Sequence, residues 1–378
     1  MEFLSSFAPF YFYVYCFMIL ILTMSQYGSV RKIQGHNFVN RYFSYRPIVL
    51  FVTIFFVIFG FRPLSPYLGD TSNYGKQYKV LQTFGVFDSY ESDVIKSDYL
   101  FYYFRRFCAL LSVDVHVWLA SIMLFYLTMM FLGCKKIDYR HGAILMLFCL
   151  GSFVFYPYAV NGIRNGVACS FAIMAVACLC KEKKLSALMW SVIAIGCHKS
   201  AVLPVVAMFF VYYVNNPKYM YISWIGAIVL SLAIGGYIEN ILLAINYDER
   251  LVTQLQGDNA DGQVLEHRFR WDFLLYSSLP IILGWYTIFK RKLYDKPFLI
   301  LIGTYIYSNA LWVLTIRAMF SNRIAYLSWF IYPVVLAYPL MNFPVFKKQH
   351  VKKTSLLLIA HLILTIVLLR GLFYWNLI

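Results

Sequence analysis

Residues Asn161–Ser200 read NGIRNGVACSFAIMAVACLCKEKKLSALMWSVIAIGCHKS and predict a helical hairpin. Two apolar arms flank the basic turn Lys181–Lys184, and at about 1.5 Å of rise per residue each arm would be roughly 20 to 25 Å long. Arg164 opens the first arm and His198 ends the second. We therefore expect both side chains at the same end of the hairpin, opposite the basic turn. Ionisable groups in or beside membrane helices are costly, so this pair is a functional candidate.

The composition predicts an all-α polytopic membrane protein. The chain is 61% hydrophobic and only 13% charged, whereas soluble domains average nearer 45–50% apolar and about 25% charged residues. The net charge of +16 would suggest a nucleic-acid partner on a soluble protein. On a membrane protein it is better explained as loop charge that orients the helices, so no nucleic-acid partner is expected. Residues 1–378 are expected to form a single integral domain.

Twelve apolar stretches predict about 12 transmembrane helices, within a range of 11–14. They lie near 8–27, 46–62, 115–133, 141–158, 164–180, 185–198, 200–214, 221–239, 271–289, 297–316, 322–341 and 354–374. Lys and Arg gather in the intervening segments 31–46, 135–140, 181–184, 290–296 and 347–353. With both termini outside, all five clusters fall in the cytoplasm, as the positive-inside rule requires.

That topology holds only if residues 99–113 do not cross the membrane. This short segment carries Arg105 and Arg106 in its middle, and we interpret it as an amphipathic helix on the outer face. In this topology two long polar loops, near 63–98 and 240–270, lie on the outer face. Arg164, His198, Arg317 and Arg323 would lie there too, and the positive-inside rule does not explain arginines on that face.

The first long loop contains the sequence FRPLSPYLGDTSNYGKQY, in which Pro and Gly favour an ordered turn over a helix. Asp70 follows the second predicted span closely, and its carboxylate is a candidate general base for a sugar hydroxyl. An exposed loop aspartate or an Asx-turn would explain Asp70 equally simply. Asp98, just before the amphipathic segment, is expected to be a helix N-cap.

Arg164 is the residue whose position most favours anion binding. A guanidinium at a helix N-terminus adds positive charge to the positive end of the dipole, which is unfavourable unless an anion binds there. Its planar fork suits a phosphate group. The neighbouring Gly162 and Gly166 are explained by close helix packing. His198 has three open interpretations: a donor to a phosphate, a proton carrier, or a structural partner of a backbone carbonyl.

Further arginines are predicted to line the same outer rim. They are Arg268, Arg270, Arg317 and Arg323. Each alone is also explained by a lipid headgroup contact, but together they suit an anionic substrate such as a lipid diphosphate. The eight cysteines have no metal-ligand spacing, and the chain has no DxD, HExxH or Cys/His cluster. No metal and no other cofactor is therefore expected.

Several motifs resemble the EpsG family of Wzy-like polysaccharide polymerases. They are NGIRNGVACSFAIMAVACL with CHKSA, GDTSNY, DYLFYYF and SNRIAYL, in this family's order over roughly 60 to 345. The resemblance implies a GT-C-type glycosyltransferase of the bacterial inner membrane. It would join undecaprenyl-diphosphate-linked oligosaccharide repeat units at the periplasmic face to build O-antigen, capsule or exopolysaccharide. Membrane lipid is an implied partner, and a chain-length regulator is an open one.

The resemblance also implies roles for individual residues. The residues that match the family pattern are Asp70, Tyr74, Arg164, His198 and Arg323; Arg268, Arg270 and Arg317 match less closely. In the resulting hypothesis Arg164 and Arg323, helped by Arg268 or Arg270, bind the donor diphosphate, and Tyr74 contacts the acceptor sugar. His198 orients or protonates the diphosphate and Asp70 activates the acceptor hydroxyl, although the family pattern leaves the identity of the base open.

Three other classes of protein remain as alternatives. A flippase or other transporter of the same lipid-linked unit would be expected to show repeats and midplane charges, whereas these charges gather at one face. An O-antigen ligase would share the donor, the face and the arginines, while an acyltransferase would need its histidine on the cytoplasmic side. A non-catalytic assembly subunit would tolerate the loss of every arginine named above.

Overall fold

The computed structural model describes residues 7–31, 43–84, 98–245, 269–318 and 321–375, and every regular element in these ranges is a helix. The predicted all-α class is therefore confirmed for this part of the chain. The chain folds into two compact units. The first comprises residues 1–199 and 340–378, and the second comprises residues 200–339. The expected single integral domain stays a prediction.

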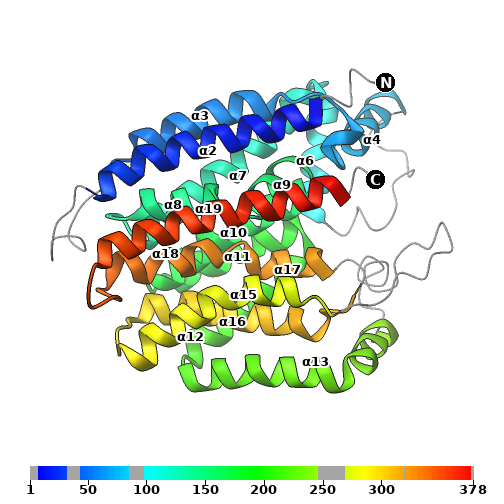
Figure 1. The fold of residues 1–378 in the computed structure, drawn as a ribbon. Helices are drawn as coiled ribbons and strands as arrows, with labels where there is room; N and C mark the ends of the chain where they lie inside the picture. The colour runs from blue at the N-terminus through cyan, green and yellow to red at the C-terminus, as the bar shows by residue number, and fades with distance from the viewer. Residues whose placement is uncertain (1–6, 32–42, 85–97, 246–268, 319–320, 376–378) are drawn as a thin grey trace. The chain divides into compact units, whose positions relative to one another are not determined.

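The first unit contains most of the helices in Figure 1. In chain order its elements are α2 (Phe7–Arg31), α3 (Arg46–Gly60), η2 (Pro66–Leu68), α4 (Thr71–Phe84), α6 (Tyr99–Leu110), α7 (Val115–Ile137), α8 (Gly142–Leu150), α9 (Phe155–Val160), α10 (Ile163–Cys180), α11 (Lys184–Cys197) and α19 (His350–Trp375).

The second unit begins within the short helix η3 (Lys199–Ala201) and is also helical. Its elements are α12 (Val202–Tyr213), α13 (Pro217–Ile245), α15 (Trp271–Trp285), η4 (Tyr286–Lys290), α16 (Lys296–Leu314), α17 (Ser321–Trp329) and α18 (Tyr332–Asn342), the last of which runs into the first unit. Within this unit α16 packs against α12, α13 and α17.

All twelve predicted apolar stretches lie mainly on helices, but 221–239 is kinked at Ile234 within α13 and two others are divided between helices. Residues 141–158 divide into α8 and α9 around a turn at 151–154, and residues 322–341 divide into α17 and α18. Seven helical segments in the described ranges are long and apolar enough to cross a membrane: Val115–Ile137, Ile163–Cys180, Pro217–Gly235, Trp271–Lys290, Lys296–Leu314, Ser321–Asn342 and His350–Arg370. Four apolar helices are shorter: Phe10–Gln26, Arg46–Gly60, Lys184–Cys197 and Lys199–Tyr213. The count of twelve spans stays a prediction.

Helix α10 is the centre of the first unit. It packs against both α7 and α11, and every residue of α10 except Arg164 and Asn165 is buried. A helix that is apolar all round must be covered on all sides to be stable. The predicted hairpin of α10 and α11 is therefore confirmed, and its first arm places Arg164 at the end of a buried helix.

The first long loop is more helical than expected. Helix η2 and the positive φ of Gly69 (+64°) form the predicted turn as far as Asp70. The prediction of a turn is wrong beyond that point, because α4 begins at Thr71 and continues through Tyr74 and Gly75. Gly75 packs against Leu64, where a Cβ would approach the Leu64 side chain to 2.7 Å. Close packing there offsets the low helix propensity of glycine.

Helix α6 confirms that residues 99–110 are helical. It buries Phe101, Arg105 and Cys108 on one side and exposes the apolar residues Tyr99 and Phe107 on the other. The exposed side suits contact with lipid, and the position of this helix on the outer face stays a prediction. Residues 85–97 and 246–268, which belong to the two expected outer loops, lie outside the described residues.

Candidate functional site

Arg164 and His198 meet at a third residue, Asp98. Nη1 of Arg164 donates to Oδ2 of Asp98 at 3.0 Å, and Nδ1 of His198 lies 3.1 Å from Oδ1 of the same carboxylate. The backbone N–H of Lys199 also donates to Oδ1, at 3.1 Å. The prediction that the two hairpin residues return to one end is thus confirmed. Sequence reasoning did not predict that an aspartate joins them.

The guanidinium of Arg164 is held on one side and open on the other. Nε donates to the hydroxyl of Tyr74 at 3.1 Å, and the guanidinium lies 5.6 Å from the centre of the Tyr74 ring. Its side chain is 22% exposed, against 1% for Asp98. Nη2 makes no hydrogen bond within the described ranges. The group is therefore oriented by two partners, with a charged edge left to bind an anion.

Asp98 was predicted to be a helix N-cap, and it does occupy the N-cap position of α6. Its side chain makes no capping hydrogen bond, however. Two other aspartates in N-cap positions behave in the ordinary way: Asp114 accepts from His116 N and Asp295 accepts from Phe298 N, each at 2.8 Å. The predicted N-cap position of Asp98 is therefore confirmed, but its side chain makes no capping bond, and its carboxylate binds Arg164 and His198.

Arg62 holds the turn that precedes α10. This guanidinium is 1% exposed and donates to the carbonyl oxygens of Phe59 and Val160 and to Oγ1 of Thr71. Thr71 Oγ1 donates in turn to Val160 O at 2.8 Å. Burial lowers the pKa of Arg62 to about 10, although nearby tyrosine hydroxyls oppose the shift, so the group stays charged at neutral pH. The sequence placed Arg62 in the loop but did not predict this role.

Asp70 lies beside the same turn and is exposed. Its backbone N–H donates to Oδ1 of Asn161 at 2.8 Å. A Cβ at Gly69 would overlap the Asn161 side chain, so glycine is needed there for both its space and its positive φ. Asp70 is thus fixed next to the start of α10, and its function as a base stays a prediction.

The two glycines around Arg164 differ in how tightly they pack. A Cβ at Gly166 would lie 2.7 Å from the backbone carbonyl oxygen of Tyr158, whereas a Cβ at Gly162 would have an ordinary contact of 3.5 Å with the Tyr158 ring. The expectation of close helix packing is confirmed for Gly166 only. This packing holds the first turn of α10 against α9 and so helps to fix Arg164.

The remaining predicted arginines belong to the second unit. Arg270 forms a bidentate ion pair with Asp272, at 2.9 and 2.7 Å, and its guanidinium lies 3.6 Å from the centre of the Phe273 ring. Arg317 lies over Phe269 at 5.4 Å. Arg323 is exposed on α17. Arg268 lies outside the described residues. The role of these residues in diphosphate binding stays a prediction.

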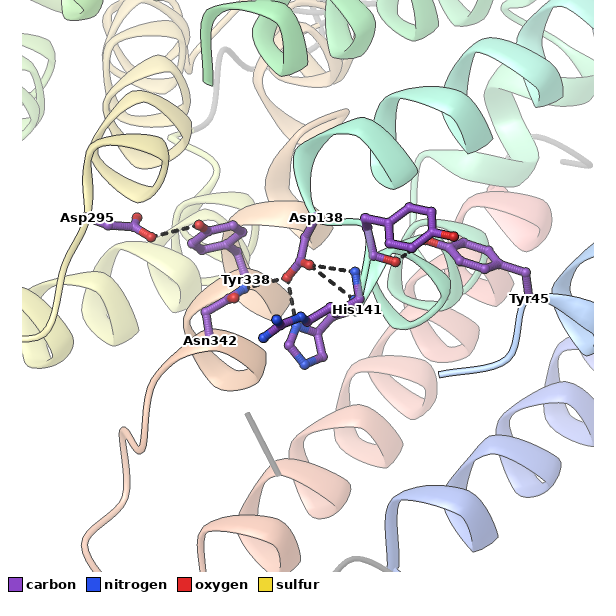
Figure 2. Close-up of polar contacts among 8 residues, drawn as sticks. Tyr45, Asp138, His141, Asp295, Tyr338 and Asn342 are labelled. Carbon is purple, nitrogen blue, oxygen red and sulfur yellow. Dashed lines mark hydrogen bonds and ion pairs between the residues drawn. The ribbon is translucent and has the colours of Figure 1, made fainter. Parts of the chain in front are cut away.

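A second Asp–His pair directly follows the C-terminal end of α7 (Figure 2). Oδ2 of Asp138 binds Nδ1 of His141 at 2.7 Å and Nδ2 of Asn342 at 2.8 Å, while Oδ1 accepts from the backbone N–H groups of Arg140 and His141. Burial opposes ionisation of Asp138, but the hydrogen bonds and charge of His141, with Asn342, outweigh burial and lower its pKa to about 2. Figure 2 also shows Tyr338 donating to Asp295 within the second unit, at 2.8 Å.

The described part of the chain holds no group of three or more His, Cys, Asp or Glu side chains arranged to bind a metal ion. Its eight cysteines carry free thiols, and seven of them are buried.

The long apolar helices indicate an integral membrane protein, and the end of the α10–α11 hairpin opposite the basic turn carries a partly buried cluster of ionisable side chains. The EpsG family model matches residues 45–376, so the chain belongs to the EpsG family. Searches of curated proteins and of solved structures gave no match. Membership agrees with the resemblance carried by the sequence motifs and indicates a membrane protein of the polysaccharide polymerase type, with a glycosyltransferase-like activity.

Proposed function

We propose that this protein is a GT-C-type membrane glycosyltransferase that joins undecaprenyl-diphosphate-linked oligosaccharide repeat units into a polysaccharide. Membership of the EpsG family supports the class of reaction. The observation that carries the assignment of the site is Arg164, held by Asp98 and Tyr74 with one edge open. The product would be an O-antigen, a capsule or an exopolysaccharide.

The position of Arg164 favours a diphosphate ligand. Arg164 is the second residue of α10, so its charge adds to the positive end of the helix dipole. Asp98 neutralises part of that charge, and the exposed edge of the guanidinium remains for a second anion. A lipid diphosphate supplies negative oxygens whose spacing matches two parallel N–H donors. We infer that Arg164 binds the diphosphate of the donor.

The proposed reaction is a displacement at an anomeric carbon. The acceptor hydroxyl oxygen forms a bond to the anomeric carbon of the donor, and the bond from that carbon to the diphosphate oxygen breaks. The leaving lipid diphosphate takes the electron pair, and Arg164 stabilises the charge that develops there. The hydroxyl proton passes to a base, for which Asp70 and His198 are the two candidates at this end of the first unit.

Other predicted residues are proposed to assist. Arg317 and Arg323 are proposed to add positive charge for the diphosphate, as is Arg268. Arg270 is the weakest candidate, because its Nε and Nη2 atoms are already bound to Asp272. Tyr74 is proposed to contact the acceptor sugar while its hydroxyl orients Arg164.

The distribution of charge supports a reaction at the outer, periplasmic face of a bacterial inner membrane. The start of α7 is tied to Arg62 through His116, whose Nδ1 lies 3.1 Å from Arg62 O. Basic residues occur at the far ends of the two helices that begin near the site: Lys135 and Lys136 end α7, and the basic turn follows α10. Basic ends face the cytoplasm by the positive-inside rule, which leaves the Arg164 end outside.

The test is polymer synthesis by the purified protein in liposomes supplied with a lipid-diphosphate-linked repeat unit. The wild type should give a ladder of glycan products, and Arg164→Ala should give none at equal protein level and equal thermal stability. Lys136→Ala, at the other end of α7, is the matched control and should give the wild-type ladder. A folded wild-type protein that makes no ladder from its native repeat unit would disprove the proposed polymerase activity. Transfer of one preformed chain to another lipid acceptor would instead indicate a ligase. Movement of the repeat unit across the bilayer without bond formation would indicate a flippase.

A further inference from the structure

Asp98 is a tightly constrained carboxylate at the Arg164 end of the first unit. Its side chain is 1% exposed and binds three groups that come from outside its own helix: Arg164 Nη1, His198 Nδ1 and the backbone N–H of Lys199. The partner histidine is 100 residues away in the chain. A buried carboxylate is stable only with such partners, because an ionised carboxylate without them is strongly destabilised by burial.

The arrangement has a local cost to the fold. An aspartate that caps a helix typically contributes about 1 kcal/mol of stability, and Asp114 and Asp295 make such caps. Asp98 occupies the same position at the start of α6 without making the capping bond. The bonds to Arg164 and His198 therefore replace a stabilising interaction that this residue type readily forms. That exchange is understandable if the orientation of the two cationic side chains matters to function.

The bond to Asp98 also fixes where His198 carries its proton. An ionised carboxylate has only acceptor oxygens, so the atom of His198 that faces it, Nδ1, must be the N–H donor. In a neutral imidazole the lone pair then lies on Nε2. A carboxylate that holds Nδ1–H of a histidine orients the ring and stabilises the imidazolium that forms when Nε2 takes a proton.

We propose that Asp98 is a positioning residue that keeps the proton of His198 on Nδ1, so that Nε2 accepts the proton of the acceptor hydroxyl while Arg164 binds the leaving diphosphate. This inference rests on the proposed function and selects His198 over Asp70 as the base. The hydroxyl proton moves to Nε2, the oxygen bonds to the anomeric carbon, and the diphosphate leaves with the electron pair of the broken bond. Nδ1–H remains bonded to Asp98 throughout.

A purely structural role for Asp98 is the alternative, since the same bonds join α6 to the α10–α11 hairpin. The two roles differ in what they predict for Asp98→Asn, which keeps the shape and one acceptor oxygen but removes the charge. For a positioning residue, kcat for polymer synthesis should fall about 100-fold or more, the range for loss of acid–base catalysis, while the unfolding temperature in detergent changes little. Asp138→Asn, which alters the other Asp–His pair, should leave kcat per folded protein within about threefold of wild type.

The pH dependence separates the roles further. Among the described residues, the ionisable groups around His198 include Asp98 at the start of α6, Arg164 on α10 with Tyr74 and Asp70 beside it, and Cys197 and Lys199 on either side in the chain. Removal of the Asp98 charge makes the imidazolium less stable, so Nε2 loses its proton at lower pH. The acidic limb of the kcat profile should therefore move to lower pH in Asp98→Asn and stay in place in Asp70→Asn. An unmoved limb in Asp98→Asn, or a shifted limb in Asp70→Asn, would overturn the assignment.

A measurement that needs no substrate keeps this inference separate from the proposed function. In protein with 15N-labelled histidine, the nitrogen shifts report which ring nitrogen carries the proton, and His198→Gln identifies the signals. Wild type should show His198 protonated at Nδ1, and Asp98→Asn should redistribute the proton towards Nε2. If the wild-type protein makes no polymer but its His198 carries the proton on Nδ1, only the proposed function is disproved. If the wild-type protein is active but its His198 carries the proton on Nε2, only the role proposed for Asp98 is disproved.

Discussion

Among the described residues of the first unit are two Asp–His pairs. Asp138–His141 directly follows the C-terminal end of the 23-residue helix α7, and Asp98–His198 lies at the start of α6 (Figure 1). In the pair Asp138–His141 the partners are three residues apart, and Nδ1 lies 2.7 Å from the carboxylate. In the pair Asp98–His198 they are 100 residues apart, and the corresponding distance is 3.1 Å. The two pairs thus use the same atoms of the same residue types.

Their third partners differ. The carboxylate oxygens of Asp138 are bound by two backbone N–H groups, by its histidine and by Asn342, so this carboxylate is satisfied by partners within the fold. Asp98 binds Arg164, a cation whose own side chain is partly exposed. An Asp–His contact is therefore a poor indicator of function by itself. A buried carboxylate that orients a partly exposed guanidinium is a better one, because it presents charge to a ligand.

The largest expected effect is that of Arg164→Lys. Lysine keeps the charge but has no planar fork, and it cannot bind Tyr74 and Asp98 while also presenting two parallel donors. Polymer synthesis should fall roughly 100-fold or more, the magnitude seen when one preorganised donor to a developing oxyanion is removed. The measurement is the initial rate in liposomes. Lys136→Arg, near the Asp138 pair, should keep the wild-type rate; a rate near wild type for Arg164→Lys would show that the fork is not used.

Gly166→Ala is expected to have the next largest effect. Its Cβ would lie 2.7 Å from Tyr158 O, a backbone atom that cannot move aside cheaply. Separation of α9 and α10 should cost about 1–3 kcal/mol of stability and should also displace Arg164, which lowers the rate of synthesis. The matched change is Gly162→Ala, where the nearest contact would be 3.5 Å. Equal unfolding temperatures for the two variants would contradict this account of the packing.

Asp138→Asn should change stability and its pH dependence without changing activity. The pKa of Asp138 falls from 3.8 to about 2 in the folded protein, so the ionised form is favoured by roughly 2 kcal/mol. Because the folded pKa is the lower one, this contribution is complete above the unfolded pKa and is lost as pH falls towards 2. Thermal unfolding in detergent should show wild type more stable than Asp138→Asn near neutral pH, with the gap closing in acid. A gap that widens in acid would have the wrong sign.

The smallest effect is expected for Arg270→Lys. Arg270 also pairs with an aspartate, Asp272, which lies two residues away in the chain. This ion pair is bidentate, and the side chains of Arg270 and Asp272 are 39% and 54% exposed. Exposed pairs contribute at most about 1 kcal/mol, and the fork of Arg270 is already occupied. The rate of synthesis should stay within about threefold of wild type. A loss as large as that of Arg164→Lys would place Arg270 directly at the diphosphate.

The sequence predicted the parts of the site that depend on helical geometry. The lengths of the two hairpin arms were enough to bring Arg164 and His198 to one end, since helical rise per residue is nearly constant. The same reasoning missed Asp98 and Arg62, whose partners lie across other elements. It also predicted a turn for the whole stretch FRPLSPYLGDTSNYGKQY, whereas the residues from Thr71 onwards lie in α4, where Gly75 packs against Leu64.

What the sequence by itself determined was the class of protein, most of the helices and the placement of Arg164 and His198 at one end of the hairpin, because hydropathy and helical periodicity are local properties. The tertiary structure alone decided which aspartate holds that pair. Asp98, Asp114 and Asp295 all stand before helices and look alike in sequence, yet two cap their helices and Asp98 does not. The difference arises because α10 and α11 bring a guanidinium and an imidazole to Asp98, and a buried carboxylate binds positively charged donors more strongly than a backbone N–H.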